Sequence, residues 1–234
     1  MQNAQLTLIT GDTHRNFQHI YSLCTLINTS KDDLLIILGD AGINYYGCIK
    51  DNYLKHELSQ LPITMLCIHG NHERRPESLG IYEEIEWRDG IVYNEPDFPD
   101  LLFAKDGEVY TINSKKYIVI GGAYSVDKDI RILRNLGWWA DEQPSSEIKK
   151  RVEDRLELEN WRVDAVLSHT TPLKYEPREV FMSHIDDSKV DKSTEIWLET
   201  IEDKLDYDQW FCGHYHTSKT IDKIRFLYRD IYEI

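Results

Sequence analysis

Five short apolar segments end in the same kind of residue, and this repetition constrains the fold more than any other feature of the sequence. Each run passes into Asp, Asn or His, in four of the five cases by way of a glycine. The five ends are Gly11-Asp12-Thr13-His14, Gly39-Asp40, Gly70-Asn71-His72-Glu73, His169 and Gly213-His214-Tyr215-His216. Because ligands of α/β proteins bind outside the carboxyl ends of strands, the five ends predict one shared polar site.

The runs that lead to these ends alternate with helical patterns, and this alternation predicts an α/β fold. The segment 34–38 is continuously apolar, as expected for a strand buried on both faces. Apolar residues at 17, 20, 24 and 27 have helical spacing, and a second helix is predicted over about 50–60. Such alternation is typical of parallel βαβ units. No linker or repeat divides the sequence, so we expect one domain over 1–234.

The middle and the end of the sequence follow a different pattern. The segments 90–94, 101–105, 107–112 and 115–122 are short, closely spaced and separated by turns, which is typical of a meandering sheet. A polar, Trp-containing insertion follows at 123–146. Ile148, Val152 and Leu156 then indicate a helix, and Trp197, Ile201 and Leu205 the last one. Three strands are predicted to close the chain, at 208–212, 219–221 and 224–234.

Charge and composition argue against several classes of protein. The sequence has 27 basic and 41 acidic residues, a formal net charge of −14. Such a surface repels phosphate backbones and anionic membranes, so neither duplex nucleic acid nor a membrane is predicted as a partner. The N-terminal segment lacks the features of a signal peptide, and no apolar run approaches the roughly 20 residues of a membrane helix. The four scattered cysteines form no CxxC pair, and we expect a cytoplasmic protein with reduced thiols.

The spacing within the strand ends suggests how their side chains converge. A glycine permits the sharp turn that each strand end needs. In an extended backbone, residues two apart point the same way. We therefore expect Asp12 with His14, and His214 with His216, each to direct both side chains at one point.

The chemistry of the strand-end residues predicts a metal site. Taken singly, Asp12 or Asn71 is an ordinary turn residue, and His214 with His216 is a surface pair. Together, carboxylate oxygens, imidazole nitrogens and an amide oxygen suit Mn, Fe, Zn, Co or Ni. Roughly seven ligands exceed the four that a zinc site takes. Two metals that share a carboxylate are the simplest arrangement, and such pairs stabilise both the attacking and the leaving oxygen of phosphoryl displacement.

The ordered series of motifs, from residue 11 to residue 216, resembles the calcineurin-like metallophosphoesterases. The resemblance implies a four-layer α/β/β/α sandwich of two mixed sheets flanked by helices. It also implies two divalent metal ions, with Mn, Fe or Zn expected. The implied ligands are Asp12, His14 and His216 for one metal, Asn71, His169 and His214 for the other, and Asp40 as the bridge. A metal-bridging hydroxide would attack phosphorus in line, with His72 as general acid at the leaving oxygen.

One position departs from a branch of this superfamily. Protein phosphatases carry an acidic residue three positions after the Asp that is Asp40 here, and it orients the histidine that is His72 here. This chain has Ile43 followed by Asn44, which argues against close kinship with Ser/Thr protein phosphatases and leaves Asn44 as a candidate to orient His72. Arginine suits bidentate phosphate contact, so Arg74, beside a motif, and Arg131, in the insertion, are candidate substrate contacts.

The leading hypothesis is therefore a phosphoesterase that hydrolyses phosphate mono- or diesters. The expected substrate is a phosphorylated small molecule, a nucleotide or a phosphoprotein. The alternatives are a Ser/Thr protein phosphatase-like activity, a nucleotide phosphohydrolase and a non-catalytic interaction module on the same fold. The module is disfavoured because all seven implied ligands are present.

Overall fold

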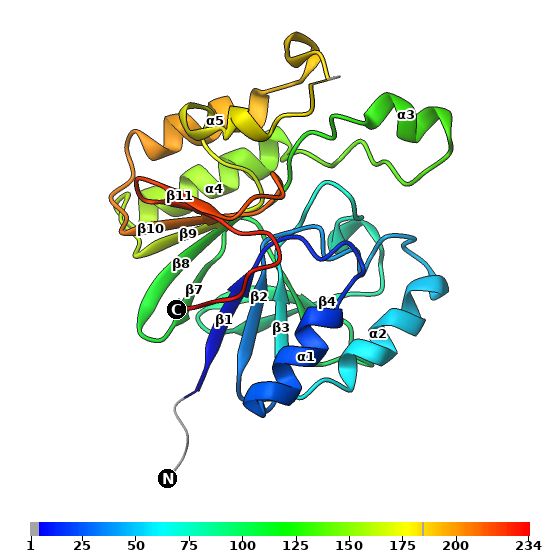
Figure 1. The fold of residues 1–234 in the computed structure, drawn as a ribbon. Helices are drawn as coiled ribbons and strands as arrows, with labels where there is room; N and C mark the ends of the chain where they lie inside the picture. The colour runs from blue at the N-terminus through cyan, green and yellow to red at the C-terminus, as the bar shows by residue number, and fades with distance from the viewer. Residues whose placement is uncertain (1–4, 184) are drawn as a thin grey trace.

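Two β-sheets stacked face to face form the centre of the fold, and helices cover the outer face of each (Figure 1). The computed structural model describes residues 5–183 and 185–234. The first sheet has the order β13-β1-β2-β3-β6-β5-β4, and the second has the order β11-β12-β10-β9-β8-β7.

The first sheet begins with three parallel strands joined by helices. Its strands are β1 (Thr7–Thr10), β2 (Leu34–Ile37), β3 (Thr64–Cys67), β4 (Glu83–Trp87), β5 (Gly90–Asn94), β6 (Leu101–Ala104) and β13 (Tyr232–Glu233). The helix α1 (Gln18–Ile27) connects β1 to β2, and α2 (Asn52–Ser59) lies between β2 and β3. β1 pairs in parallel with β2, and β2 with β3. The predicted βαβ units are confirmed.

The second sheet is also mixed, with a parallel centre. Its strands are β7 (Val109–Ile112), β8 (Lys115–Ile120), β9 (Ala165–Ser168), β10 (Gln209–Cys212), β11 (Lys219–Ile221) and β12 (Ile224–Phe226). The helices on its outer face are α4 (Ser146–Leu158) and α5 (Ser193–Glu202). β8, β9 and β10 run parallel, so β9 and β10 end on the same side of the sheet.

Three apolar cores separate the layers, because alternate strand residues face opposite sides of each sheet. Leu35 and Ile37 pack with α1 and α2, whereas Ile36 packs between the sheets with Leu167 and Phe211. On the far side, Val152 of α4 and Ile201 of α5 pack on the second sheet. This is the predicted four-layer α/β/β/α sandwich.

The predicted meander of the middle segments is wrong. β4, β5 and β6 form an antiparallel meander in the first sheet, whereas β7 and β8 form a hairpin in the second. The chain changes sheet just after β6, at a turn where Gly107 has a φ of 84° and donates to the carbonyl of Val119 in β8. The edge strand β4, which has mostly exposed residues, was not predicted.

The predicted final strand over 224–234 is also wrong, because it is two strands in different sheets. Leu227 still donates to the carbonyl of Cys212 in the second sheet, but Ile234 donates to Thr7 in the first. The C-terminus therefore returns beside β1 (Figure 1). The last long helix, α5, ends at Glu202, and Leu205 joins the same core from the following turn.

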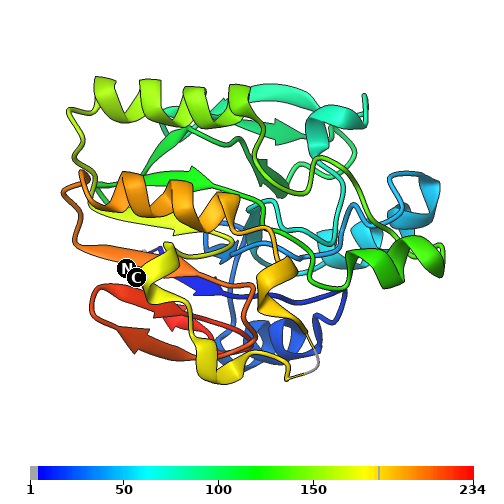
Figure 2. The ribbon, with the colours of Figure 1, turned by 90° about the horizontal axis from the view of Figure 1, so that it is seen from above.

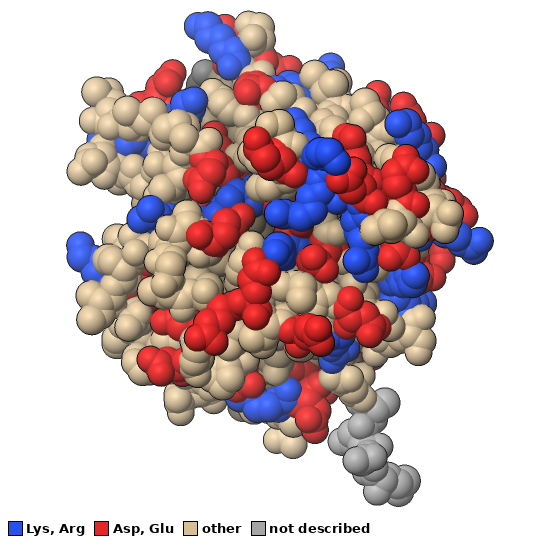
Figure 3. All heavy atoms as spheres, turned by 180° about the vertical axis from the view of Figure 1, so that it is seen from behind, with Lys and Arg blue, Asp and Glu red and all other residues tan. Residues whose placement is uncertain are grey.

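The insertion after β8 carries a short helix, α3 (Lys128–Leu133), which stands out from the stacked layers in both ribbon views (Figures 1 and 2). On the face shown in Figure 3, basic and acidic side chains are interspersed, so that face lacks the continuous basic surface that duplex binding requires. Among the described residues, no helix combines the length and the apolar character needed to cross a membrane.

Candidate metal centre

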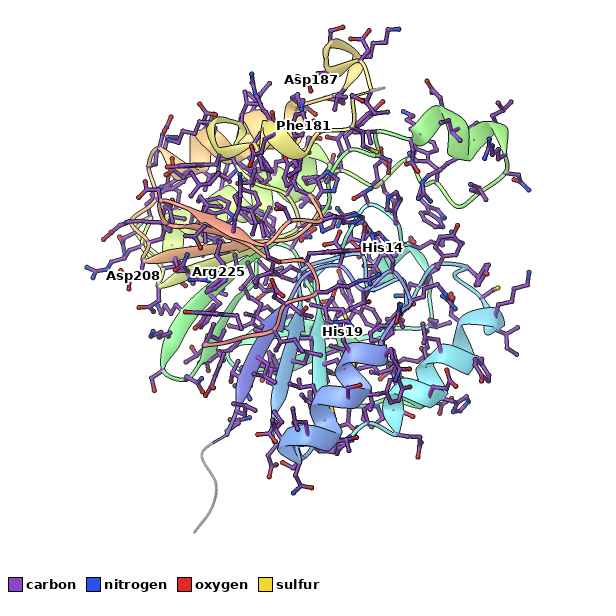
Figure 4. The ribbon with its side chains drawn as sticks, in the orientation of Figure 1. His14, His19, Phe181, Asp187, Asp208 and Arg225 are labelled. Atoms are coloured by element: carbon purple, nitrogen blue, oxygen red, sulfur yellow. The ribbon has the colours of Figure 1, made fainter. Side chains whose placement is uncertain are left out.

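The five polar strand ends meet at one edge of the sandwich. β1, β2 and β3 contribute from the first sheet, and β9 and β10 contribute from the second. His14 lies where the loops of the two sheets come together, below the insertion that carries α3 (Figure 4). The structure thus brings together all seven residues predicted as ligands, in two groups with one carboxylate between them.

The first group consists of Asp12, His14 and His216. The Nε2 atoms of the two histidines are 2.8 Å apart. Asp12 Oδ2 lies 3.3 Å from His216 Nε2 and 3.7 Å from His14 Nε2. His14 and His216 are 33% and 48% exposed, so this group is open to solvent.

The second group consists of Asn71, His169 and His214. Asn71 Oδ1 lies 2.8 Å from His169 Nε2 and 3.1 Å from His214 Nδ1. His169 and Asn71 are buried, so this group lies deeper than the first.

Asp40 joins the two groups through a single oxygen. Its Oδ2 lies 3.8 Å from His14 Nε2 and 3.7 Å from His169 Nε2. Burial alone would raise the pKa of Asp40. The neighbouring imidazoles of His72, His169 and His14 outweigh this, so the pKa lies well below its usual range. A carboxylate charge is therefore held between the groups.

Backbone amides fix the orientation of both carboxylates. The amide of His214 donates to Asp12 Oδ1, and the amide of His72 donates to Asp40 Oδ1, each at 2.8 Å. The Oδ2 atom of each is left for the two groups, and Asp12 Oδ2 is buried without a hydrogen-bond partner among the described residues. Such orientation by surrounding groups is typical of metal ligands.

Four of the seven residues have a left-handed backbone, with φ of 45° at His14, 50° at Asp40, 66° at His214 and 49° at His216. This conformation costs a non-glycine residue on the order of 1–3 kcal/mol and is concentrated at functional sites. The extended geometry expected at His14, His214 and His216 is wrong. As a result, His214 points to the second group and His216 to the first, although Asp12 and His14 do converge.

The glycines are required mainly for space rather than for the turn that was expected. A Cβ atom on Gly70 would lie 2.1 Å from the amide nitrogen of Asp40, and one on Gly213 would lie 2.4 Å from Asp12 Oδ1. Among the four strand-end glycines, Gly39 alone combines a close approach, 2.2 Å to His169 Nδ1, with a left-handed φ of 91°. The backbones must approach this closely for the two groups to share Asp40.

The hydrogen bonds of the second group show that it suits a cation. His169 Nδ1 lies 2.7 Å from the carbonyl of Leu38 and therefore carries a proton. Asn71 Nδ2 donates to Ser125 Oγ at 2.9 Å, which turns Asn71 Oδ1 toward His169 Nε2. Two electron-pair donors then face each other at 2.8 Å and need a proton or a metal ion between or beside them. The residues present thus fit a divalent metal.

The protonation of the histidines is compatible with this. Burial, followed by the nearby His169, lowers the pKa of His214 to about 3, so its imidazole is neutral, as ligation requires. The carboxylate of Asp12, 3.3 Å from His216 Nε2, raises the pKa of His216. A metal ion in the first group would bind the neutral form of His216, so binding there should be weaker at low pH.

His72 lies beside both groups without belonging to either. Its Nε2 is 3.2 Å from Asn71 Nδ2 and 3.4 Å from Arg131 Nη2, and its ring centroid is 5.6 Å from that of His14. Burial lowers the pKa of His72. Asn44, the candidate to orient it, instead accepts a hydrogen bond from the hydroxyl of Tyr82 at 2.7 Å and makes none to His72 among the described residues.

The two candidate arginines differ in position. Both carboxylate oxygens of Asp127 hold Arg131 Nε at 2.8 Å, and the carbonyl of Gly137 accepts from its Nη1, so Nη2 is directed at His72. The Arg74 side chain packs against Gly47, and within the described residues it makes no hydrogen bond to the ligand groups. Among the described residues, Arg131 therefore contacts His72 at the site, and no contact of Arg74 with the site residues is seen.

Residues outside the motifs also support the site, and sequence reasoning missed them. Ser125 orients Asn71, the carbonyl of Leu38 orients His169, and Tyr228 stacks on His216 with ring centroids 4.6 Å apart. These residues have no motif of their own, and only their place after a strand or near the chain end gives any sequence signal.

Comparison with known proteins assigns the family. A family model described as calcineurin-like phosphoesterase matches residues 6–218. The chain belongs to the calcineurin-like phosphoesterases. The matched range includes all seven candidate ligands and His72. A search of curated protein sequences returned no match.

Solved structures are similar to this chain at low sequence identity. The protein TT1561 of Thermus thermophilus is 10% identical and has a TM-score of 0.51, over 99% of this chain and 98% of its own. An archaeal phosphodiesterase is 10% identical at a TM-score of 0.33, over 98% of this chain and 99% of its own. A protein serine/threonine phosphatase of Saccharomyces cerevisiae is 12% identical at 0.36, over 97% and 68%. Of these three, the first has a TM-score above 0.5, and that likeness indicates a shared fold.

Proposed function

We propose that this chain is a dinuclear metal-dependent phosphoesterase formed by one domain over residues 1–234. The observation that carries the proposal is Asp40 Oδ2, which lies less than 4 Å from an imidazole nitrogen of each group. One carboxylate oxygen placed between two sets of nitrogen and oxygen ligands is the arrangement that a pair of metals requires. The mixed ligand set favours Mn, Fe or Zn.

The assignment of ligands follows the two groups. Asp12, His14 and His216 would hold one metal, and Asn71, His169 and His214 would hold the other, with Asp40 shared. When bound, two such ions polarise phosphoryl oxygens and lower the pKa of a water molecule to generate a nucleophile. The protein contributes fixed ligand orientations, because backbone amides and the Leu38 carbonyl hold Asp12, Asp40 and His169 in place.

His72 and Arg131 would act on the substrate rather than on the metals. His72, whose Nε2 lies 3.2 Å from Asn71 Nδ2, would give a proton or a hydrogen bond to the leaving oxygen. Arg131 Nη2, directed at the same place, would contact a phosphate oxygen. Arg74 remains a predicted substrate contact without a supporting contact in the structure.

The identity of the substrate is inferred only as a phosphate mono- or diester of a small molecule, nucleotide or phosphoprotein. A protein phosphatase-like activity has less support, because His72 Nδ1 is buried without a hydrogen-bond partner among the described residues, where an acidic partner would lie in those enzymes. We retain the prediction of a cytoplasmic protein that does not bind duplex nucleic acid, in line with the formal charge of −14.

The test is metal-dependent hydrolysis by the purified chain. We expect the metal-depleted protein to be inactive toward an aryl phosphate monoester and an aryl phosphate diester, and added Mn²⁺ to restore turnover of at least one. Mn²⁺ should also raise the midpoint of thermal unfolding, because a ligand at about 100 times its Kd stabilises the folded state by about 2.7 kcal/mol. A protein that binds two Mn²⁺ ions and hydrolyses neither substrate would contradict the proposal.

Replacement of Arg131 should separate monoester from diester hydrolysis. A monoester carries a second negative charge, so it depends more on the guanidinium than a diester does. For Arg131→Ala we expect kcat/KM to fall by about tenfold to a hundredfold for the preferred substrate if it is a monoester, since charge-assisted hydrogen bonds contribute about 1.5–3 kcal/mol. Arg134→Ala, an exposed change in the same segment, is the control. Equal rates for both variants would exclude Arg131 from substrate binding.

A further inference from the structure

Tyr215 occupies an unusual place between the two groups of ligands. Its neighbours His214 and His216 both have a left-handed backbone, and their side chains point to different groups. Tyr215 itself turns the other way and packs, partly buried, against the core that includes α5, edge-on to Phe226 and stacked on Phe181 with ring centroids 6.1 Å apart. Phe181 lies in the segment above the second sheet (Figure 4). The two ligating histidines thus flank a single inserted aromatic side chain.

The hydroxyl of Tyr215 begins a buried chain of hydrogen bonds. It lies 3.1 Å from Thr170 Oγ1, and Thr170 Oγ1 donates to Glu195 Oε1 at 2.8 Å. Because the single proton of Thr170 goes to Glu195, the hydroxyl of Tyr215 must donate to Thr170. Thr170 and Glu195 are only 1% and 3% exposed, so water does not compete for these bonds.

These hydrogen bonds connect α5 to both histidine-bearing loops of the second sheet. Thr170 directly follows His169, Tyr215 lies between His214 and His216, and Glu195 belongs to the first turn of α5. Three of the four imidazoles in the two groups therefore belong to residues that adjoin Thr170 or Tyr215 in the sequence. The hydrogen bonds end at the Glu195 carboxyl, because its Oε2 has no hydrogen-bond partner among the described residues, and Lys192, at the N-cap of α5, is paired with Glu176 at 2.7 Å.

We propose that Glu195, acting through Thr170 and Tyr215, is a positioning residue that holds the 213–216 loop so that His214 and His216 face different metals. This inference rests on the proposed function, since it assumes that these histidines bind metal. A left-handed backbone at two ligands separated by one residue relaxes unless it is held from outside, and the side chain of Tyr215 is placed to help hold it. Loss of these hydrogen bonds should weaken metal binding while the sandwich stays folded.

The test compares variants that break the Tyr215–Thr170–Glu195 hydrogen bonds with variants that keep them. Tyr215→Phe removes only the hydroxyl, and Glu195→Leu removes the acceptor. Glu195→Gln keeps an acceptor oxygen, and because burial raises the pKa of Glu195 to about 7, loss of its charge is a small change. Tyr207→Phe is the matched control, since Tyr207 donates to Glu202 at the other end of α5 at 2.9 Å, in the same core.

The measurements are Mn²⁺ affinity by calorimetry on the metal-depleted full chain, the electron paramagnetic resonance signal of the coupled Mn²⁺ pair, and the thermal unfolding midpoint. We expect Tyr215→Phe and Glu195→Leu to weaken Mn²⁺ binding about tenfold to a hundredfold and to reduce the coupled signal. Glu195→Gln and Tyr207→Phe should bind Mn²⁺ like the wild type, even where Tyr207→Phe lowers the unfolding midpoint.

The outcomes separate this inference from the proposed function. Wild-type Mn²⁺ affinity in both Tyr215→Phe and Glu195→Leu, with only the unfolding midpoint lowered, would show that these hydrogen bonds support the core and not the metals. Weakened Mn²⁺ binding in Tyr207→Phe equal to that in Tyr215→Phe would likewise overturn the positioning role. A wild-type protein that binds no Mn²⁺ would overturn the proposed function itself, and this inference with it.

Discussion

Asp40→Asn is expected to abolish hydrolysis and to prevent binding of the metal pair. The variant keeps an oxygen that can accept the amide hydrogen of His72, but it loses the charge that lies between His14 and His169. Each metal supplies several kcal/mol of charge stabilisation in the transition state, so we expect kcat/KM to fall by on the order of a thousandfold or more. Metal analysis should find fewer than two ions per chain, and the stabilisation by Mn²⁺ should shrink accordingly.

Asp51→Asn provides the matched control for removal of a buried carboxylate charge. Asp51 is as buried as Asp40 and accepts hydrogen bonds from the amides of Tyr46 and Gly47, but it contacts none of the seven ligands among the described residues. Its variant should retain two metals and most of the activity. If Asp40→Asn kept both metals at full affinity, the bridging assignment would be wrong.

Local sequence patterns were sufficient to predict the strand ends and their residues. The apolar runs of β1, β2, β3, β9 and β10 are each followed within a few residues by a candidate ligand, so position along the sequence indicates position in space. Parallel strands place their carboxyl ends on one side, which is why seven residues far apart in the sequence could be expected at one site.

The features that the sequence did not predict depend on contacts between distant segments. Whether a short strand such as β7 joins the first or the second sheet depends on a turn at Gly107 and on the pairing with β8, not on its own residues. The space filled by a Cβ at Gly70 depends on where Asp40 lies. The direction of Arg131 depends on Asp127 and on the carbonyl of Gly137. None of these three features is marked by a periodic pattern of apolar residues in the sequence.

His72→Ala is expected to lower kcat while leaving both metals bound. His72 contributes its backbone amide to Asp40, which the variant keeps, and its ring contacts Asn71 Nδ2 rather than the Oδ1 that faces the second group. General acid catalysis contributes about 10²–10⁴-fold, so kcat should fall by about that factor at unchanged Mn²⁺ stoichiometry. Loss of a metal in this variant would show that His72 is a ligand and that its role is misassigned.

The leaving group decides whether His72 acts as an acid. An alkoxide leaves as a strong base and needs a proton, whereas a nitrophenolate leaves readily without one. His72→Ala should therefore lower kcat much more for an alkyl ester than for the nitrophenyl ester of the same phosphate. Equal losses for both esters would mean that His72 stabilises charge on the phosphoryl group together with Arg131, whose Nη2 lies 3.4 Å from its Nε2, and does not protonate the leaving oxygen.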